Sequence, residues 1–63
     1  MFIELAVVSG SKIIVNTEYI VKIAPGHIEG YFIITMGDET NITIYEDELI
    51  RLKLELSRSH VLM

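Results

Sequence analysis

Residues 31–45, with the sequence YFIITMGDETNITIY, decide the fold class of this 63-residue chain. From Thr40 to Tyr45 apolar and polar residues alternate, as they do in a strand with one buried face. Tyr31–Met36 is a second β-prone run, and the Gly37-Asp38-Glu39 segment between the two has the composition of a turn. The stretch therefore predicts a β-hairpin.

Three runs that precede this hairpin have the same character. Phe2–Val8 and Lys12–Val15 are rich in apolar and β-branched residues, and Ser9-Gly10-Ser11 between them predicts a tight turn. These two runs predict a first hairpin. Tyr19–Ile23 predicts a third strand, which Pro25-Gly26 ends.

Residues 46–58 fit two structures. Ile50–Leu56 alternates between apolar and charged residues, as a half-exposed strand would. However, the residue types are good helix formers, acids precede bases as the helix dipole favours, and leucines at spacings of three and four fall along one side. We favour a helix, with a sixth strand as the alternative.

We therefore expect a mainly β (α+β) fold: a small antiparallel sheet of about five strands from two hairpins, with a C-terminal helix or sixth strand. Residues 1–63 form one small domain, and residues 57–63 are expected to be a frayed tail. A domain of this length is marginally stable alone, and without cysteines it has no disulfide or thiolate zinc site to support it. Oligomerisation is the remaining way to stabilise the domain, and a content of 51% hydrophobic residues favours it.

Several predicted strands are apolar on both faces. No residue of Tyr31–Ile34 is a clear solvent-facing position, and between Ile3 and Val8 only Glu4 is polar. A sheet with one wet face alternates more regularly, so we expect a second copy of the chain to cover part of this surface. A small barrel that closes on itself is the alternative. The residues expected to self-associate are Tyr31, Ile33, Leu49, Leu52 and Leu56.

The charged residues favour a protein partner over nucleic acid. The net charge is −4, and the segment from Asp38 to Glu48 holds five acids and no base. Phosphate binding needs the opposite sign, so nucleic acid is disfavoured as a partner. A weak nucleic-acid-binding module would need the five bases Lys12, Lys22, Arg51, Lys53 and Arg58 to converge on one face. The candidate partner-binding residues are Asp38, Glu39, Glu46, Asp47 and Glu48.

No residue pattern predicts catalysis, a cofactor or a metal site. His27 and Glu29 form a His-x-Glu pair, but no second ligand cluster lies at a useful spacing. No apolar run approaches the roughly 20 residues of a membrane-spanning helix, and the opening residues lack the features of a signal peptide. We expect a cytoplasmic protein of a bacterial cell or a phage-infected host cell that is not an enzyme.

The order of these segments resembles the FlbD family of small bacterial proteins. The likeness begins with the opening strand Phe2–Leu5 and the turn Ser9–Ser11. It is clearest in Ile14–Ile23, where a strand is followed by an Asn and then by Ile at a spacing of three. Ile33–Asp38 is similar to part of that family's second hairpin, and Glu46–Leu56 lies where the family has a short helix.

The family is associated with flagellar gene clusters, so the resemblance implies an accessory role. It supplies no catalytic residues that could be assigned to this chain. The chain departs from it at Asp38-Glu39, where Asn-Gly would be expected, and in an apolar rather than basic tail.

A second resemblance concerns a shorter stretch. Asp47–Leu54 is similar to the end of small acidic phage inhibitors of uracil-DNA glycosylase, which present carboxylates where DNA phosphates would lie. We therefore expect a non-enzymatic interaction protein, an accessory or regulatory factor that acts by protein contact and self-association. The alternative is a phage-type inhibitor that mimics nucleic acid through its acidic surface.

Overall fold

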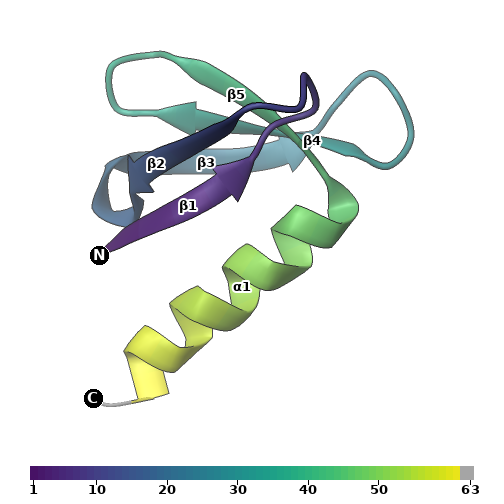
Figure 1. Ribbon diagram of the computed structural model, residues 1–63. Coiled ribbons are helices and arrows are strands. Elements are labelled where there is room, and N and C mark those ends of the chain that lie inside the picture. The colour runs from purple at the N-terminus through teal and green to yellow at the C-terminus, as the bar shows by residue number, and fades with distance from the viewer. Residues whose placement is uncertain (62–63) are drawn as a thin grey trace.

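The computed structural model describes residues 1–61 of the chain and the side chains of residues 1–58. Five antiparallel strands are followed by a C-terminal helix, which confirms the predicted α+β fold (Figure 1). The elements are β1 (Phe2–Ala6), β2 (Lys12–Asn16), the short 3-10 helix η1 (Thr17–Tyr19), β3 (Ile20–Pro25), β4 (Tyr31–Met36), β5 (Asn41–Tyr45) and α1 (Glu46–Val61).

The strands form two sheets rather than the one that the sequence predicted. β1 and β2 form an antiparallel hairpin, and the second sheet has the order β3-β4-β5. The reason is η1, which turns the chain between β2 and β3; the side chain of Asn16 caps it by accepting a hydrogen bond from the backbone N–H of Glu18 at 3.1 Å. The two sheets meet where the backbone N–H of Val8 donates to the carbonyl of Thr43 at 3.1 Å.

The strand ends differ from the prediction by one or two residues except in β4: β2 continues to Asn16, β3 continues to Pro25, and β5 begins at Asn41. The end of β1 and the start of β3 differ for a clear reason. β1 ends at Ala6 because Val7 already belongs to the turn, where its N–H donates to the carbonyl of Ser11 at 2.9 Å. Gly10 completes this turn with a φ of 98°, a conformation that glycine adopts without a Cβ clash. β3 begins at Ile20, because Tyr19 lies in η1 rather than in the strand.

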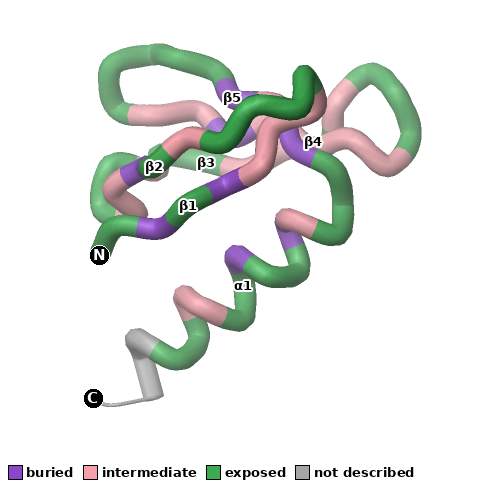
Figure 2. Tube along the Cα trace, viewed as in Figure 1, coloured by how far each residue is buried: buried purple, intermediate pink, exposed green. Residues whose placement is uncertain are grey.

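The core lies between the two sheets and one side of α1. Figure 2 shows the buried positions on the hairpin, on the three-stranded sheet and on the first turns of the helix. The buried residues are Ile3, Leu5, Val15, Ile34, Ile42, Ile44, Leu49 and Leu52. Alternate residues of β1 and β5 enter this core, as the period of a strand requires.

Residues 46–58 are helical, so the sixth-strand alternative is wrong. Three acids occupy the first turn of α1, where they are favourable with the helix dipole, and two leucines one turn apart face the core. The helical backbone continues through residues 57–61, part of the segment predicted to be a frayed tail; residues 62 and 63 lie outside the described residues. Within the described part of the chain, no helix is long and apolar enough to cross a bilayer.

Candidate protein interaction surfaces

The structure divides the predicted acidic surface into two groups. Asp38 and Glu39 lie in the turn between β4 and β5, whereas Glu46, Asp47 and Glu48 form the first turn of α1. The five residues of β5 separate the two groups, and at about 3.4 Å per residue that strand is roughly 17 Å long. The five acids therefore do not form one continuous surface.

The turn between β4 and β5 holds an ionised carboxylate in a fixed place. Hydrogen bonds from the hydroxyl and the backbone N–H of Thr40, the latter at 3.0 Å, lower the pKa of Asp38 below its ordinary value. Glu39 has a φ of 71°, in the left-handed region of backbone conformation that residues other than glycine rarely adopt. This end of the molecule therefore presents negative charge on a defined backbone.

Glu48 is half-buried and links α1 to β1. Its Oε2 accepts hydrogen bonds from Nη2 of Arg51 at 2.8 Å and from the backbone N–H of Ala6 at 3.1 Å, and Arg51 also donates to the carbonyl of Glu4. The contact with Arg51, followed by that with Ala6, lowers the pKa of Glu48, and Glu48 raises the pKa of Arg51. The other two acids of this turn are exposed.

The leucines predicted to self-associate are part of the fold. Leu49 and Leu52 are buried against the sheets, and Leu56 is half-buried beside the same core. The other apolar stripe of the helix is free: Ile50 and Leu54, one turn apart, are both exposed. The alternation that suggested a strand in this segment thus comes from a helix that has one buried and one exposed apolar stripe.

Tyr31 and Ile33, the other two predicted self-association residues, are half-buried on β4. The Tyr31 ring stands edge-on to that of Tyr45, with centroids 5.0 Å apart, and the hydrogen bond between the two hydroxyl groups raises the pKa of Tyr31. Ile33 lies between Ala24 of β3 and Thr43 of β5 in register. This face is mixed in polarity rather than continuously apolar.

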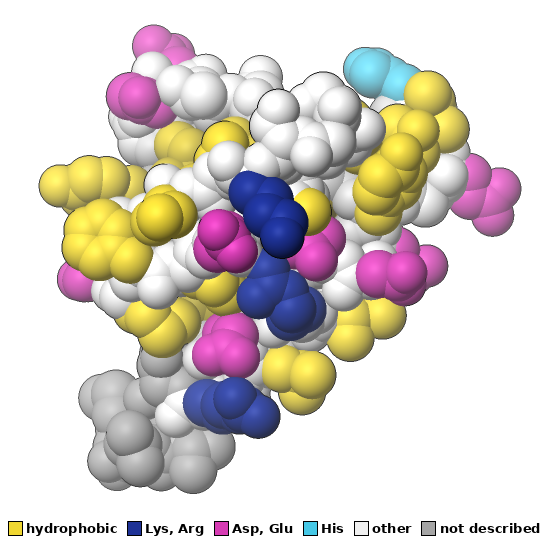
Figure 3. All heavy atoms as spheres, in the orientation of Figure 1, with side chains coloured by type: hydrophobic (Ala, Val, Ile, Leu, Met, Phe, Trp, Pro, Cys, Tyr) yellow, Lys and Arg dark blue, Asp and Glu magenta, His cyan; other side chains and the backbone are white. Residues whose placement is uncertain are grey.

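The basic residues do not form an uninterrupted positive surface. Arg51 pairs with Glu48, and Arg58 pairs with Glu55 at 3.3 Å. Figure 3 shows basic and acidic side chains interleaved over the hairpin and the helix. Lys22 lies elsewhere and lines a shallow depression on the three-stranded sheet.

Sequence reasoning missed an apolar groove of about 630 Å³ between β2 and the β4–β5 turn. We call it the β2 groove and define it by the lining residues Phe2, Ile14, Asn16, Tyr19, Met36 and Asp38. Phe2, Ile14 and Tyr19 are 72%, 69% and 66% exposed. The available signal was that Phe2 and Ile14 occupy positions on β1 and β2 that alternate with buried residues, where polar side chains are usual.

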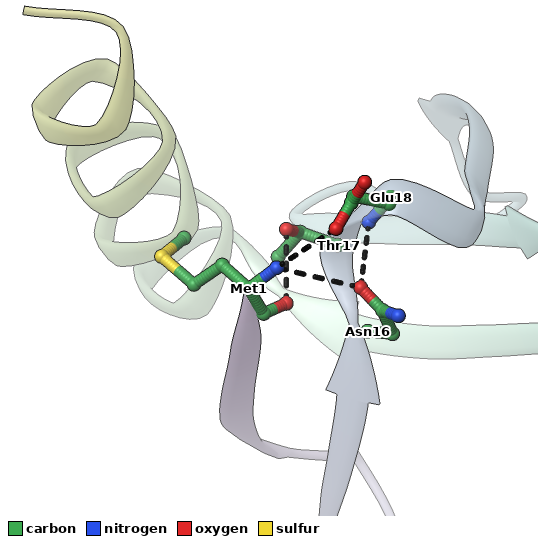
Figure 4. Close-up of polar contacts among 4 residues, drawn as sticks. All are labelled: Met1, Asn16, Thr17 and Glu18. Carbon is green, nitrogen blue, oxygen red and sulfur yellow. Dashed lines mark hydrogen bonds and ion pairs between the residues drawn. The ribbon is translucent and has the colours of Figure 1, made fainter.

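Hydrogen bonds around Met1 and η1 fix one end of this groove (Figure 4). The carbonyl of Met1 accepts from the backbone N–H and the hydroxyl of Thr17, at 2.8 and 3.0 Å, and the nitrogen of Met1 donates to the Asn16 side chain at 3.5 Å. The backbone N–H of Gly37 donates to the carbonyl of Tyr19 at 2.7 Å and so ties η1 to the β4–β5 turn. Backbone hydrogen bonds therefore hold this end of the groove in place.

No family model matches the chain, and no curated protein or solved structure matches it either. The two resemblances in the sequence therefore remain predictions. Among the described residues, no three His, Cys, Asp or Glu side chains are placed to hold a metal ion.

Proposed function

We propose that the chain is a non-enzymatic interaction protein, an accessory or regulatory factor that contacts another protein and associates with itself. The observation that carries this proposal is the number of large apolar side chains left outside the core. Phe2, Ile14, Tyr19, Val21, Ile50 and Leu54 are each more than half exposed. Single exposed apolar residues are ordinary, but grouped ones mark contact surfaces.

Five of these six side chains form two separate surfaces, and Val21 of β3 belongs to neither. Ile50 and Leu54 lie on α1, and Phe2, Ile14 and Tyr19 line the β2 groove. We assign self-association to the helix stripe, because two copies of an apolar helix stripe can pack against each other around a two-fold axis. The β2 groove is then available for a different protein.

The charged side chains support this proposal less than the apolar ones do. Mimicry of nucleic acid needs a continuous carboxylate surface, whereas the acids here lie at opposite ends of β5 and Glu48 bonds to β1. Binding of nucleic acid needs free bases, whereas Arg51 and Arg58 pair with acids. We therefore propose neither role.

The test is light scattering coupled to size exclusion over a range of protein concentrations. The wild-type protein is expected to show saturable self-association, and the double variant Ile50→Ser/Leu54→Ser is expected to be monomeric. At a dilution at which the wild type is also monomeric, the two proteins are expected to have the same melting temperature. Lys53→Ser, which changes an exposed residue on the same helix, is the matched control and should associate normally. A wild-type protein that stays monomeric at the highest concentration contradicts self-association.

A further inference from the structure

We propose that the β2 groove binds an extended, positively charged apolar segment of a partner protein, which adds as a strand to the free edge of β2. This inference rests on the proposed function and names the chemistry of the foreign partner.

The first support is the free edge of β2. β2 pairs with β1 alone among the strands that the structure describes. The N–H of Thr17 bonds to the carbonyl of Met1, and the N–H of Val7 to that of Ser11, so in this ladder the odd-numbered residues of β2 bond to β1. The backbone groups of Lys12, Ile14 and Asn16 therefore point away from β1, where an added strand could pair with them.

The second support is the contrast with β3, one of the two edge strands of the other sheet. β3 has an irregular register next to Val21 and ends in Pro25, and β2 has neither of these features that discourage pairing at an edge. At the middle of β2 stands Ile14, an exposed β-branched residue that pairs well with another strand. Lys12 begins β2 but does not line the groove.

The third support is the apolar lining. An added strand places alternate side chains on one face, where they would meet Phe2, Tyr19 and Met36. Exposed aromatic rings of this kind are the usual anchors of protein contacts. Figure 3 shows hydrophobic side chains gathered at the end of the molecule where β1 begins.

Charge complementarity sets the sign of the partner. Asp38 lines the groove. Glu18 lies in η1 beside Tyr19, but its carboxylate pairs with the nitrogen of Met1 at 3.4 Å, and Glu39 lines the depression on the three-stranded sheet instead. None of the five Lys and Arg residues lines the groove. The carboxylate of Asp38 attracts a positive segment and repels a negative one, so we expect bases beside the apolar residues of the partner.

The test uses synthetic peptides and calorimetric or fluorescence titration of the full chain. The basic peptide KVRIKVR should bind the wild-type protein at least tenfold more tightly than the acidic peptide EVDIEVD. Its affinity should fall at least tenfold for Phe2→Ser/Tyr19→Ser and about threefold for Asp38→Asn, and stay unchanged for Ile50→Ser/Leu54→Ser. Melting curves check that every variant is folded, and Asp38→Asn keeps the test valid if the double groove variant is not.

Four results would overturn the proposal. The first is that the two peptides bind with equal affinity, or that neither peptide binds. The second is full affinity in Phe2→Ser/Tyr19→Ser. The third is full affinity for both N-methylated forms of KVRIKVR, one with the odd-numbered and one with the even-numbered backbone nitrogens methylated, because strand addition needs one of these two sets of N–H groups. The fourth is loss of self-association in the groove variant alone, which would place a second copy in the groove. If the basic peptide fails but the wild-type protein self-associates through Ile50 and Leu54, this inference falls and the proposed function stands.

Discussion

The space between the β1–β2 hairpin and the three-stranded sheet is closed along β1 and open along β2. Beside β1, α1 places Leu49 and Leu52 over the inner faces of both sheets, and both side chains are buried. Along β2 no element among the described residues has this role, and Ile14 and Tyr19 stay exposed around the groove. Residues of the same kind therefore hold the fold together on one side and remain available for contact on the other.

This difference separates stability from binding within one small domain. On the closed side, removing an apolar side chain leaves a cavity, which costs free energy of folding. On the open side, the same removal takes away surface that water already reaches, so folding is nearly unaffected and only binding suffers.

The largest expected effect compares two leucines of α1. Leu52 is 0% exposed and Leu54 is 59% exposed. Leu52→Ala is expected to lower the free energy of unfolding by about 3 kcal/mol, because it empties a fully buried site. Leu54→Ala, which has the same helix propensity change, should lower it by less than about 1 kcal/mol. Urea denaturation of the dilute, monomeric protein measures both losses, and equal losses would mean that both sides of the helix are packed within one chain.

The same comparison holds between neighbouring residues of β1. Ile3 is buried and Phe2 is exposed in the β2 groove. Ile3→Ala is expected to cost about 2 kcal/mol of unfolding free energy and Phe2→Ala less than about 1 kcal/mol. A Phe2→Ala variant as unstable as Ile3→Ala in urea would show that the open side belongs to the core.

The polar link between α1 and β1 should be worth less than the leucines. Glu48→Gln is expected to lower the unfolding free energy by about 1 kcal/mol at neutral pH, because charge-assisted hydrogen bonds to Ala6 and Arg51 become weaker. Asp47→Asn is the matched control, since Asp47 shares the first helical turn and is exposed.

The pH dependence of the Glu48→Gln effect follows from the direction of the pKa shift. The folded state lowers the pKa of Glu48 below its ordinary value of 4.5, so the stabilisation is complete above that value. It is lost as the pH falls through the lower, folded-state pKa. The difference between wild type and Glu48→Gln should therefore shrink in acid, and a difference that grows below pH 4.5 would contradict this account.

The smallest effect concerns the turn between β4 and β5, which borders the open side. Glu39 has a φ of 71°, which costs an ordinary residue more than it costs glycine. Glu39→Gly is expected to raise the unfolding free energy by about 0.5 kcal/mol. Glu39→Gln keeps the backbone penalty and removes the charge, so its thermal unfolding should match the wild type. A gain in Glu39→Gln equal to that in Glu39→Gly would assign the effect to charge instead.

Local pattern predicted much of the fold. The turn residues and the alternation of residues 40–45 gave both hairpins, and the helix-forming residues after Tyr45 outweighed their strand-like alternation. The division into two sheets was not predictable, because it depends on η1. The sequence shows a break in the strand pattern after Val15, but it does not show that Asn16 caps a helical turn there.

The candidate surfaces were harder to predict than the elements. From the sequence, Glu48 was predicted to bind a partner and Leu49 to self-associate. In the structure, the orientation of α1 places Leu49 in the core and brings Glu48 within hydrogen-bonding distance of Ala6. The β2 groove joins Phe2, Ile14 and Met36 from three strands, and their proximity follows from how the sheets pack rather than from any short stretch of sequence.

The most direct test of the difference between the two sides is an NMR titration of the isotope-labelled protein with the basic peptide KVRIKVR. We predict that amide shifts change at Ile14, Tyr19 and Gly37 and that the Ile14 N–H becomes protected from exchange. The amides of Leu49 and Leu54 should not move. Shifts confined to α1, or an Ile14 N–H that exchanges as fast with the peptide as without it, would contradict the assignment of the open side to binding.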